Sequence, residues 1–162
     1  MDHRQSTAKL PQEVVNAFTA AALTALQELI QVEAFADPDP QNPVATCSGP
    51  LVSASLTLMR SVPGTMSLVL TEETASRLAA LYLPVGTTLN QKMLDDVAGE
   101  FANVIVGQAK TVLKGTPHHY TISTPVVTRA ASVKQLPSAA AECLAVSLQS
   151  ELGQILLFVN LP

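Results

Sequence analysis

The sequence predicts an α+β domain, with an antiparallel sheet of about five strands on which two long helices and one short helix pack. Three observations support this prediction. Apolar residues recur at helical spacing in two long segments, 12–33 and 88–114. Short runs elsewhere alternate apolar and polar residues, as half-buried strands do. Proline and glycine separate these runs, so that neighbouring strands can pair as antiparallel hairpins.

The first long helix is expected from about Gln12 to Glu33. Its apolar positions recur every three or four residues, at Val14, Phe18, Ala22, Ala25, Leu29 and Val32. Pro11 precedes the helix, where a proline is tolerated because the first turn needs no donor there. The proline-rich stretch 37–43 cannot continue a helix, and we expect it to form the longest loop.

A hairpin and a short helix are expected next. Within residues 52–58, Val, Ala and Leu alternate with Ser and Thr, which predicts a half-buried strand. Pro63-Gly64 forms a turn, and a strand returns over residues 66–70. Thr71 followed by two glutamates predicts a helix N-cap, and the short helix that it opens runs to about Tyr82.

The second long helix is expected from about Thr88 to Lys114. Thr88 with a glutamine three residues later matches a capping box, and Gly115 followed by a proline ends the helix. The rest of the chain is strand-like over three ranges, 119–129, 142–148 and 153–160. Pro125 within the first of these implies a bulge or an edge strand, because proline has no N–H to donate.

Length and composition indicate a single domain spanning residues 1–162, large enough for a hydrophobic core. Apolar residues make up 48% and charged residues 14%, which argues against an intrinsically disordered chain. The net charge of −4 and the scattered Lys and Arg residues argue against a nucleic-acid partner. Aromatic residues reach only 4%, with no Trp, so stacking on bases or sugars is not favoured either.

A cytoplasmic protein without a membrane partner is expected. No stretch approaches the roughly 18 apolar residues that a membrane helix needs, and the N-terminal segment lacks the apolar run of a signal peptide. Cys47 and Cys143 are expected to be small buried residues in a reducing compartment, with a disulfide between them as the alternative. His118 and His119 are adjacent and point to opposite sides of a strand, so no metal site is expected. No motif of nucleotide, triad or zinc-protease chemistry occurs.

The second long helix has an unusual polar side. Its large apolar residues fall on the side expected to face the core, namely Leu94, Val97, Phe101, Val104, Ile105 and Val112. The opposite side bears Asp96, Glu100, Asn103, Gly107 and Lys110. Acidic residues four positions apart repel each other, and each of the glycines Gly99 and Gly107 costs about 1 kcal/mol relative to alanine. With Ala102, these glycines are expected to leave a low surface beside Glu100 and Asn103 that a partner can approach. A solvated polar side is the alternative.

The segment from Leu94 to Leu113 resembles the signature helix of the CheX branch of the CheC/CheX/FliY chemotaxis phosphatases. The family pattern is D-x-x-G-E-x-x-N-x-x-x-G-N-A-K-x-x-L, and residues 96–113 are DVAGEFANVIVGQAKTVL. Gln108 replaces the usual asparagine, and Leu83-Pro84 replaces the usual Met-Leu-Gly ending of the short helix. The resemblance extends over nearly the whole chain, since three further segments look familial: Ser48-Gly49, Pro63-Gly64 and Ile122-Ser123-Thr124-Pro125.

The resemblance implies a CheC/CheX-like fold and an enzyme that hydrolyses the aspartyl phosphate of a CheY-like receiver. Asn103 would orient the attacking water, and Glu100 would pair with a lysine of the receiver. Contacts with the receiver would come from Asp96, Gly99, Gly107 and Lys110, although Asp96 could simply be solvated and Lys110 could serve the helix dipole. The receiver would supply Mg²⁺, so no cofactor or metal of the chain's own is expected.

Some alternatives stay open at this point. Glu13 and Asn16 repeat the Glu-x-x-Asn spacing in the first helix, and CheC-type relatives have two such sites. This pair lacks flanking glycines and a preceding acid, so a capping or solvated role is expected, with a second active site as the alternative. The alternative functions are a non-catalytic module that sequesters a phosphorylated receiver and a flagellar-switch-related interaction protein. A homodimer joined at sheet edges is also implied, with the Pro125 strand and the final hairpin as the expected edges.

Overall fold

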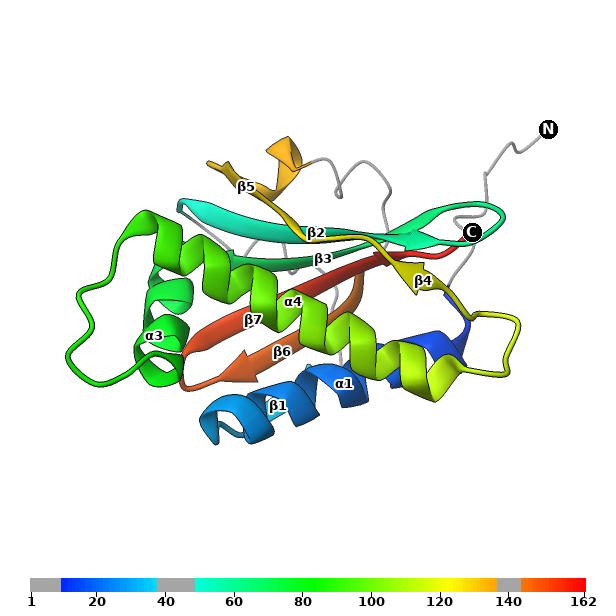
Figure 1. The fold of residues 1–162 in the computed structure, drawn as a ribbon, viewed down its shortest axis with the longest axis horizontal. Coiled ribbons are helices and arrows are strands. Elements are labelled where there is room, and N and C mark those ends of the chain that lie inside the picture. The colour runs from blue at the N-terminus through cyan, green and yellow to red at the C-terminus, as the bar shows by residue number, and fades with distance from the viewer. Residues whose placement is uncertain (1–9, 38–48, 137–143) are drawn as a thin grey trace.

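The structure is a computed structural model that describes residues 10–37, 49–136 and 144–162 (Figure 1). Cys47, Cys143 and all but the first residue of the predicted 37–43 loop lie outside these ranges. The described chain has the predicted α+β architecture, with helices packed on an antiparallel sheet. Among the described residues, no helix is both long enough and apolar enough to cross a lipid bilayer.

The sheet is built from two central hairpins. The described helices are α1 (Gln12–Ile30), α3 (Glu72–Tyr82) and α4 (Gln91–Leu113), with a 3₁₀ turn η1 (Val133–Gln135). The strands are β1 (Ala34–Ala36), β2 (Leu51–Met59), β3 (Gly64–Thr71), β4 (Thr121–Ile122), β5 (Val126–Ala130), β6 (Leu144–Ser150) and β7 (Gly153–Asn160). They lie in the order β1-β6-β7-β3-β2-β4, with β5 also paired to β2, and all pairs are antiparallel. The β2–β3 and β6–β7 hairpins therefore meet where β3 pairs with β7.

The described part of the sheet has seven strands, where the sequence predicted about five. β1 was missed because three residues are too few to show alternation. The predicted strand 119–129 is divided into β4 and β5, since Pro125 cannot donate to the ladder and both pieces pair with β2. The edge position predicted for the Pro125 strand is confirmed. The other predicted edge is wrong, because β6 pairs with β1 and β7 lies inside the sheet.

Side chains of the central strands alternate between two buried faces of the sheet. One face meets the helices through Val52, Ala54, Leu56, Leu58, Met66, Leu68, Leu70, Ile155, Leu157 and Val159. The other forms a smaller apolar cluster with η1, made of Leu51, Val69, Val133, Leu136, Leu156 and Phe158. The sequence predicted a half-buried strand, but the first part of β2 is buried on both faces. Ser53 on the second face is only 2% exposed, whereas Thr57 further along is exposed.

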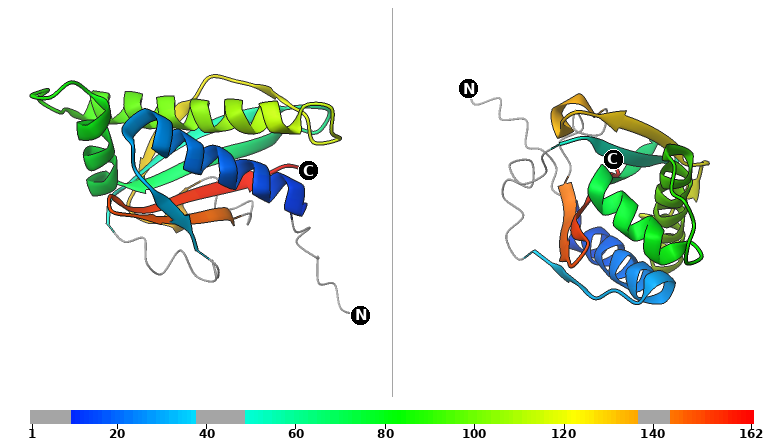
Figure 2. Two further views of the ribbon diagram at one scale, coloured as in Figure 1. Left: turned by 90° about the horizontal axis from the view of Figure 1, so that it is seen from below. Right: turned by 90° about the vertical axis from the view of Figure 1, so that its left-hand side faces the viewer.

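The helices α1 and α4 lie side by side on one face of the sheet, with α3 across one end (Figure 2). Buried alanines are frequent in both long helices, and such small side chains allow close packing. Phe18 of α1 stacks on Tyr120 with ring centroids 6.2 Å apart, and the Tyr120 hydroxyl donates to the Val106 carbonyl at 2.8 Å. Burial raises the pKa of Tyr120 above its ordinary value.

The end of α1 differs from the prediction. The helix stops at Ile30 rather than Glu33, because Gln31 adopts a left-handed conformation with φ of 53°. The amide of Val32 then donates to the Leu26 carbonyl at 3.2 Å, as in a Schellman-type end. Glycine usually occupies the left-handed position, so a glutamine there gives no sequence signal for the helix end.

The N-terminal caps of the other two helices differ in outcome. Thr71 caps α3 as predicted, with its hydroxyl accepting from the Thr74 amide at 3.1 Å. The capping box predicted at Thr88 is wrong. Asn90 caps α4 instead, and its side-chain oxygen accepts from the Met93 amide at 2.9 Å. α4 thus begins at Gln91 and ends close to the predicted position.

Candidate functional site

One side of α4 is exposed because the other side fills the core. Its buried residues are Val97, Ala98, Gly99, Phe101, Ala102, Ile105, Val106, Ala109 and Leu113. The burial predicted for Val97, Phe101 and Ile105 is confirmed, but Val112 is 60% exposed and its predicted burial is wrong. The prediction considered only the large side chains. The alanines of α4 are buried too, and they place the middle of the buried side nearer to Leu113 than to Val112. Glu100 and Asn103 remain on the outer side.

A groove of about 430 Å³ lies between α4 and the connection from β4 to β5. The helix side of the groove is lined by Asp95, Asp96, Gly99, Glu100 and Asn103. The strand side is lined by Ile122, Ser123, Thr124, Pro125 and Val127. The structure therefore brings four of the site residues predicted from sequence into one hollow, and it adds a wall from the sheet edge.

Ser123 holds the strand wall against β2 at the point where Pro125 interrupts the ladder. Its amide donates to the Thr57 carbonyl at 3.2 Å, and its Oγ accepts from the Thr57 amide at 2.8 Å. A side-chain oxygen thus satisfies a backbone donor that a regular strand would have paired. The neighbouring Thr124 is exposed, and its hydroxyl makes no hydrogen bond to the part of the chain that the structure describes. That hydroxyl is available to a group bound in the groove.

Gly99 of α4 lies directly against this wall. A Cβ on Gly99 would be 3.6 Å from the Cβ of Pro125 and 3.8 Å from Cγ2 of Val127, so the glycine forms the groove floor rather than an open surface. Ala102 is fully buried, and the prediction that it leaves a low surface beside Glu100 is wrong. Gly107, in contrast, faces open space, with nothing within 4 Å of where its Cβ would be.

Glu100 and Asn103 are exposed one helical turn apart, on the same side of α4. Within residues 10–37, 49–136 and 144–162, neither side chain forms a hydrogen bond or an ion pair with the protein. An ionised carboxylate accepts hydrogen bonds and pairs with a cation, whereas an amide both donates and accepts. Together they can hold a cationic group beside a water molecule, although neither is a nucleophile activated by a neighbouring base.

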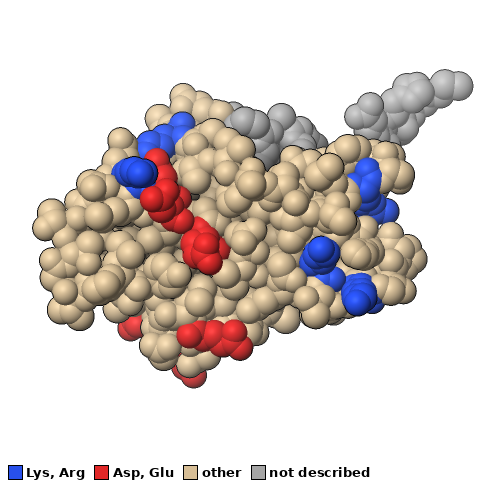
Figure 3. Space-filling model, in the orientation of Figure 1, with Lys and Arg blue, Asp and Glu red and all other residues tan. Residues whose placement is uncertain are grey.

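Charge is unevenly distributed along α4. Figure 3 shows acidic side chains over its first half, with basic side chains beside them at the start of the helix and again over its second half. The acids are Asp95, Asp96 and Glu100. Asp95 is compensated, because the Arg129 Nη2 of β5 lies 2.5 Å from its Oδ1. Asp96 and Glu100 have no cationic partner in the described residues and supply the unbalanced negative charge of the groove.

Two of the predicted contact residues lie outside the groove lining. Gly107 and Lys110 follow Asn103 along the same side of α4, and Lys110 is in the last turn, where the helix dipole favours a cation. Whether they contact a partner stays a prediction. They extend the polar side of α4 beyond the groove without joining it.

The Glu13–Asn16 pair of α1 is separate from this groove. The side-chain oxygen of Asn16 accepts from Gln12 Nε2 at 2.8 Å, so the amide is already in use. A carboxylate oxygen of Glu13 lies 3.7 Å from Nε2 of His118, a loop residue between α4 and β4. These local contacts are compatible with the solvated role that the sequence favours, and the second active site stays an open alternative.

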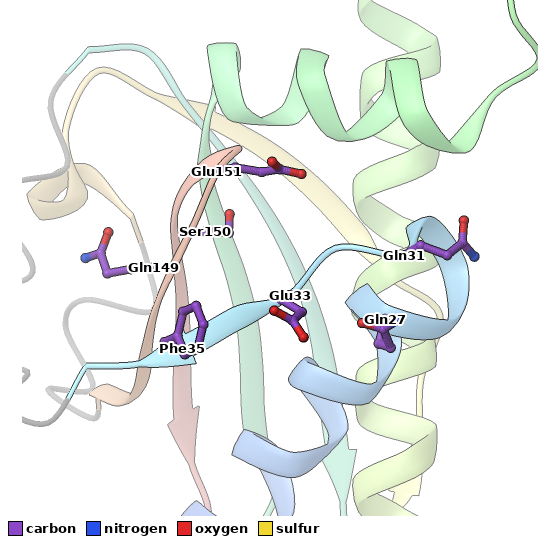
Figure 4. A pocket seen from close by; sticks show the side chains of 7 residues that line it. All are labelled: Gln27, Gln31, Glu33, Phe35, Gln149, Ser150 and Glu151. Atoms are coloured by element: carbon purple, nitrogen blue, oxygen red, sulfur yellow. The ribbon is translucent and has the colours of Figure 1, made fainter.

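A larger hollow of about 690 Å³ lies at the end of α1, next to β1 and the β6–β7 turn (Figure 4). It is lined by Gln27, Gln31, Glu33, Phe35, Gln149, Ser150 and Glu151, whose side chains do not converge on one point. The Ser150 hydroxyl already donates to the Gly153 carbonyl at 2.9 Å. None of the predicted site residues lies here, and no nucleophile stands beside a base. Size alone therefore does not make this hollow the candidate site.

Sequence reasoning did not place Asp95, Thr124, Val127 or Arg129 at the site. The signal available for Thr124 was the familial look of the segment 122–125, which by itself assigns no role to the residue. Arg129 gave no signal, because its partners are distant in sequence. Within the described residues, no three His, Cys, Asp or Glu side chains come together to hold a metal ion.

The chain is similar to known proteins in both sequence and fold. A family model described as Chemotaxis phosphatase CheX matches residues 52–149, which include α4 and both sides of the groove. The structure of CheX from Vibrio vulnificus superposes with a TM-score of 0.71 at 21% identity, covering 91% of this chain and 95% of that chain. CheX from Desulfovibrio desulfuricans superposes with a TM-score of 0.70 at 19% identity, covering 93% of this chain and 99% of that chain. A chain of a CheX–CheY–BeF₃–Mg²⁺ complex from Borrelia burgdorferi superposes with a TM-score of 0.62 at 16% identity, covering 91% of this chain and 97% of that chain. At these identities the structures establish the fold alone, and no curated protein sequence matches.

Proposed function

The chain belongs to the CheX family of chemotaxis phosphatases, and from this premise we propose that it hydrolyses the aspartyl phosphate of a CheY-like receiver domain. Asn103 orients the attacking water, and Glu100 pairs with a lysine of the receiver. The observation that supports this proposal most is the exposed, unpaired carboxylate and amide in one groove. The Borrelia complex of CheX with CheY, BeF₃ and Mg²⁺ supports the choice of a receiver as the partner.

The chemistry of an acyl phosphate suits a site of this kind. Phosphoryl transfer to water passes through a loose transition state, so catalysis needs alignment and charge stabilisation more than a strong base. The Asn103 amide can accept a hydrogen bond from one water and hold it in line with the P–O bond that breaks. Mg²⁺ and a lysine come from the receiver, and this chain needs no cofactor of its own.

Glu100 fixes the register of docking. Its carboxylate, one turn from Asn103, receives a charge-assisted hydrogen bond from the receiver lysine, and this bond strengthens as water leaves the interface. Asp96, four residues before Glu100, lines the same groove and contacts the receiver beside it. Gly99 forms the floor below them, while Gly107 and Lys110 contact the receiver further along α4.

The decisive experiment follows the decay of phosphorylated receivers. CheY-like receivers are charged with acetyl phosphate, and loss of the aspartyl phosphate is recorded with and without the protein. Wild type should accelerate the loss, and Asn103→Ala should abolish the acceleration while the receiver still binds. Glu100→Ala should weaken binding as well, because it removes the docking carboxylate.

Matched controls come from α1, which repeats the same spacing. Glu13→Ala and Asn16→Ala remove the same side chains from exposed positions of α1 outside the groove and should leave the rate unchanged. Full activity in Asn103→Ala would overturn the assignment of the water-orienting residue. Residual activity in Asn103→Ala that disappears on adding Asn16→Ala would establish a second site. Binding of a phosphorylated receiver without faster decay would identify a sequestering module instead.

We also propose a homodimer that pairs free sheet edges. β1 is at one edge of the described sheet, and Phe35 on it is 69% exposed, whereas β4 and β5 form the other edge and the groove wall. Pairing through β1 leaves the groove open to a receiver. Light scattering at micromolar concentration should give twice the monomer mass for wild type and the monomer mass for Phe35→Lys. A wild-type monomer would contradict the proposal.

A further inference from the structure

The ion-pair cluster next to the groove joins three elements that are far apart in sequence. Arg129 of β5 pairs with Glu72 at the start of α3 and with Asp95 of α4, and its Nη2 also lies 3.4 Å from the Gln91 carbonyl. The side chains of Arg129, Glu72 and Asp95 are 25%, 40% and 34% exposed. A guanidinium that is partly buried and shared by two carboxylates ties β5 to both α3 and α4 at the side of the groove.

The strand β5 and the helix α4 run in opposite directions past each other. Arg129 meets Asp95, and two residues earlier Val127 lies against Gly99, four residues further along the helix. Two residues of strand span about 6.6 Å and four residues of helix about 6 Å, so these contacts keep the same register. The Arg129–Asp95 pair therefore holds β5 against α4 in the register that places Pro125 and Val127 in the groove lining.

Arg129 also controls how much negative charge the groove presents. Asp95, Asp96 and Glu100 all line it, and Arg129 neutralises only the first. Without the guanidinium, Asp95 would add a third uncompensated carboxylate. The phosphorylated aspartate of a receiver is itself an anion, and like charges brought together at an interface oppose association.

We propose that Arg129 is a positioning residue for receiver docking, which fixes the β5 wall on α4 and masks the charge of Asp95. This inference rests on the proposed phosphatase function. It concerns a residue that touches no receiver atom and acts through Asp95. Arginine suits the role because its planar fork reaches two carboxylates at once, whereas one ammonium group serves them less well.

The test compares Arg129→Gln, Arg129→Lys, the double variant Arg129→Gln/Asp95→Asn, and the control Arg77→Gln. Arg77 pairs with Glu73 at 2.6 Å on α3, outside the groove lining, so its loss changes the net charge equally. Steady-state rates are measured against concentration of acetyl-phosphate-charged receiver, at low and high salt. Thermal unfolding checks that each variant is folded at the assay temperature.

Arg129→Gln should raise KM about three- to tenfold at low salt with kcat within about twofold, as expected for a change in charge complementarity. High salt should shrink the difference. Asp95→Asn in the same chain should bring KM most of the way back to the wild-type value, because of the two carboxylates that Arg129→Gln unmasks only Asp95 lines the groove. Arg129→Lys should fall between wild type and Arg129→Gln. Arg77→Gln should match wild type.

Other outcomes overturn the inference. An unchanged KM in Arg129→Gln would show that the cluster has no part in docking. A fall in kcat without a rise in KM, not restored by Asp95→Asn, would show a merely structural role. If wild type accelerates no receiver, the proposed function fails, and the same variants are compared for affinity toward beryllofluoride-activated receivers. Equal affinities there, or no binding by wild type, would overturn the Arg129 inference as well.

Discussion

Replacing Gly107 with alanine separates the stability of α4 from its role in docking. Gly107 is in the helix interior, and nothing lies within 4 Å of where its Cβ would be. Alanine therefore gains helix propensity without a clash, and the free energy of unfolding should rise by about 0.5–1 kcal/mol. For a chain of this length the melting temperature should increase by about 1–4 °C.

The assay is urea unfolding followed by circular dichroism, with the denaturant slope m compared between variants. Gly64→Ala is the opposite control, because its Cβ would lie 2.2 Å from the Asn160 carbonyl oxygen, and relief needs a shift of β3 against β7. That variant should lose about 1–3 kcal/mol. A loss of stability in Gly107→Ala at unchanged m would refute the reasoning that this position is an open, regular helix site.

The same variant tests the docking prediction. If the receiver lies directly on Gly107, the added methyl group raises KM in a protein that is more stable than wild type, with kcat unchanged. An unchanged KM together with increased stability would place the contact surface on the groove and exclude Gly107 from it. Because Gly107→Ala is expected to be more stable than wild type, a rise in KM in this variant could not be caused by partial unfolding.

Three further changes test the core and the helix cap. Tyr120→Phe removes the hydrogen bond to the Val106 carbonyl and should cost about 1 kcal/mol at neutral pH. Burial raises the pKa of Tyr120 above 10.0 in the folded state, so wild type should lose stability as pH rises above 10, by up to about 1.4 kcal/mol per unit. Urea midpoints at pH 8 and 11 should show a smaller decrease for Tyr120→Phe, and an equal decrease would contradict this origin. Asn90→Ala removes the cap of α4 and should cost about 1 kcal/mol in urea unfolding, whereas no loss would point to another cap. Phe101→Ala should cost about 3–5 kcal/mol by the same measurement, since the ring is 1% exposed, and a cost below 1 kcal/mol would mean that the core collapses into the space.

Local sequence signals predicted most elements of the fold but missed features that depend on contacts between segments distant in the sequence. The Thr71 cap was predicted because its acceptor and donor are three residues apart. β1 could not be predicted, since its pairing partner β6 is more than a hundred residues away and it has no alternation of its own. The second buried face was missed for the same reason, because η1 returns to the sheet from a distant segment.

The candidate site divides in the same way. The polar side of α4 follows from helical periodicity, so the spacing of Asp96, Glu100 and Asn103 is enough to predict that they are neighbours. The groove could not be predicted, because its second wall is Ser123 to Val127 on another element. Ala102 was expected at the surface but is buried, because an alanine is common both in the core and at the surface and so does not indicate which side of the helix it lies on.

The sequence by itself determined the helices, the central hairpins and the exposed Glu100–Asn103 pair, because each depends on spacings within a few residues. The tertiary structure alone decided that Pro125 lies against Gly99, that Asp95 is masked by Arg129, and that β1 is an edge of the described sheet. These features join segments that are distant along the chain. Their positions are set by packing over the whole domain, which no local periodicity records.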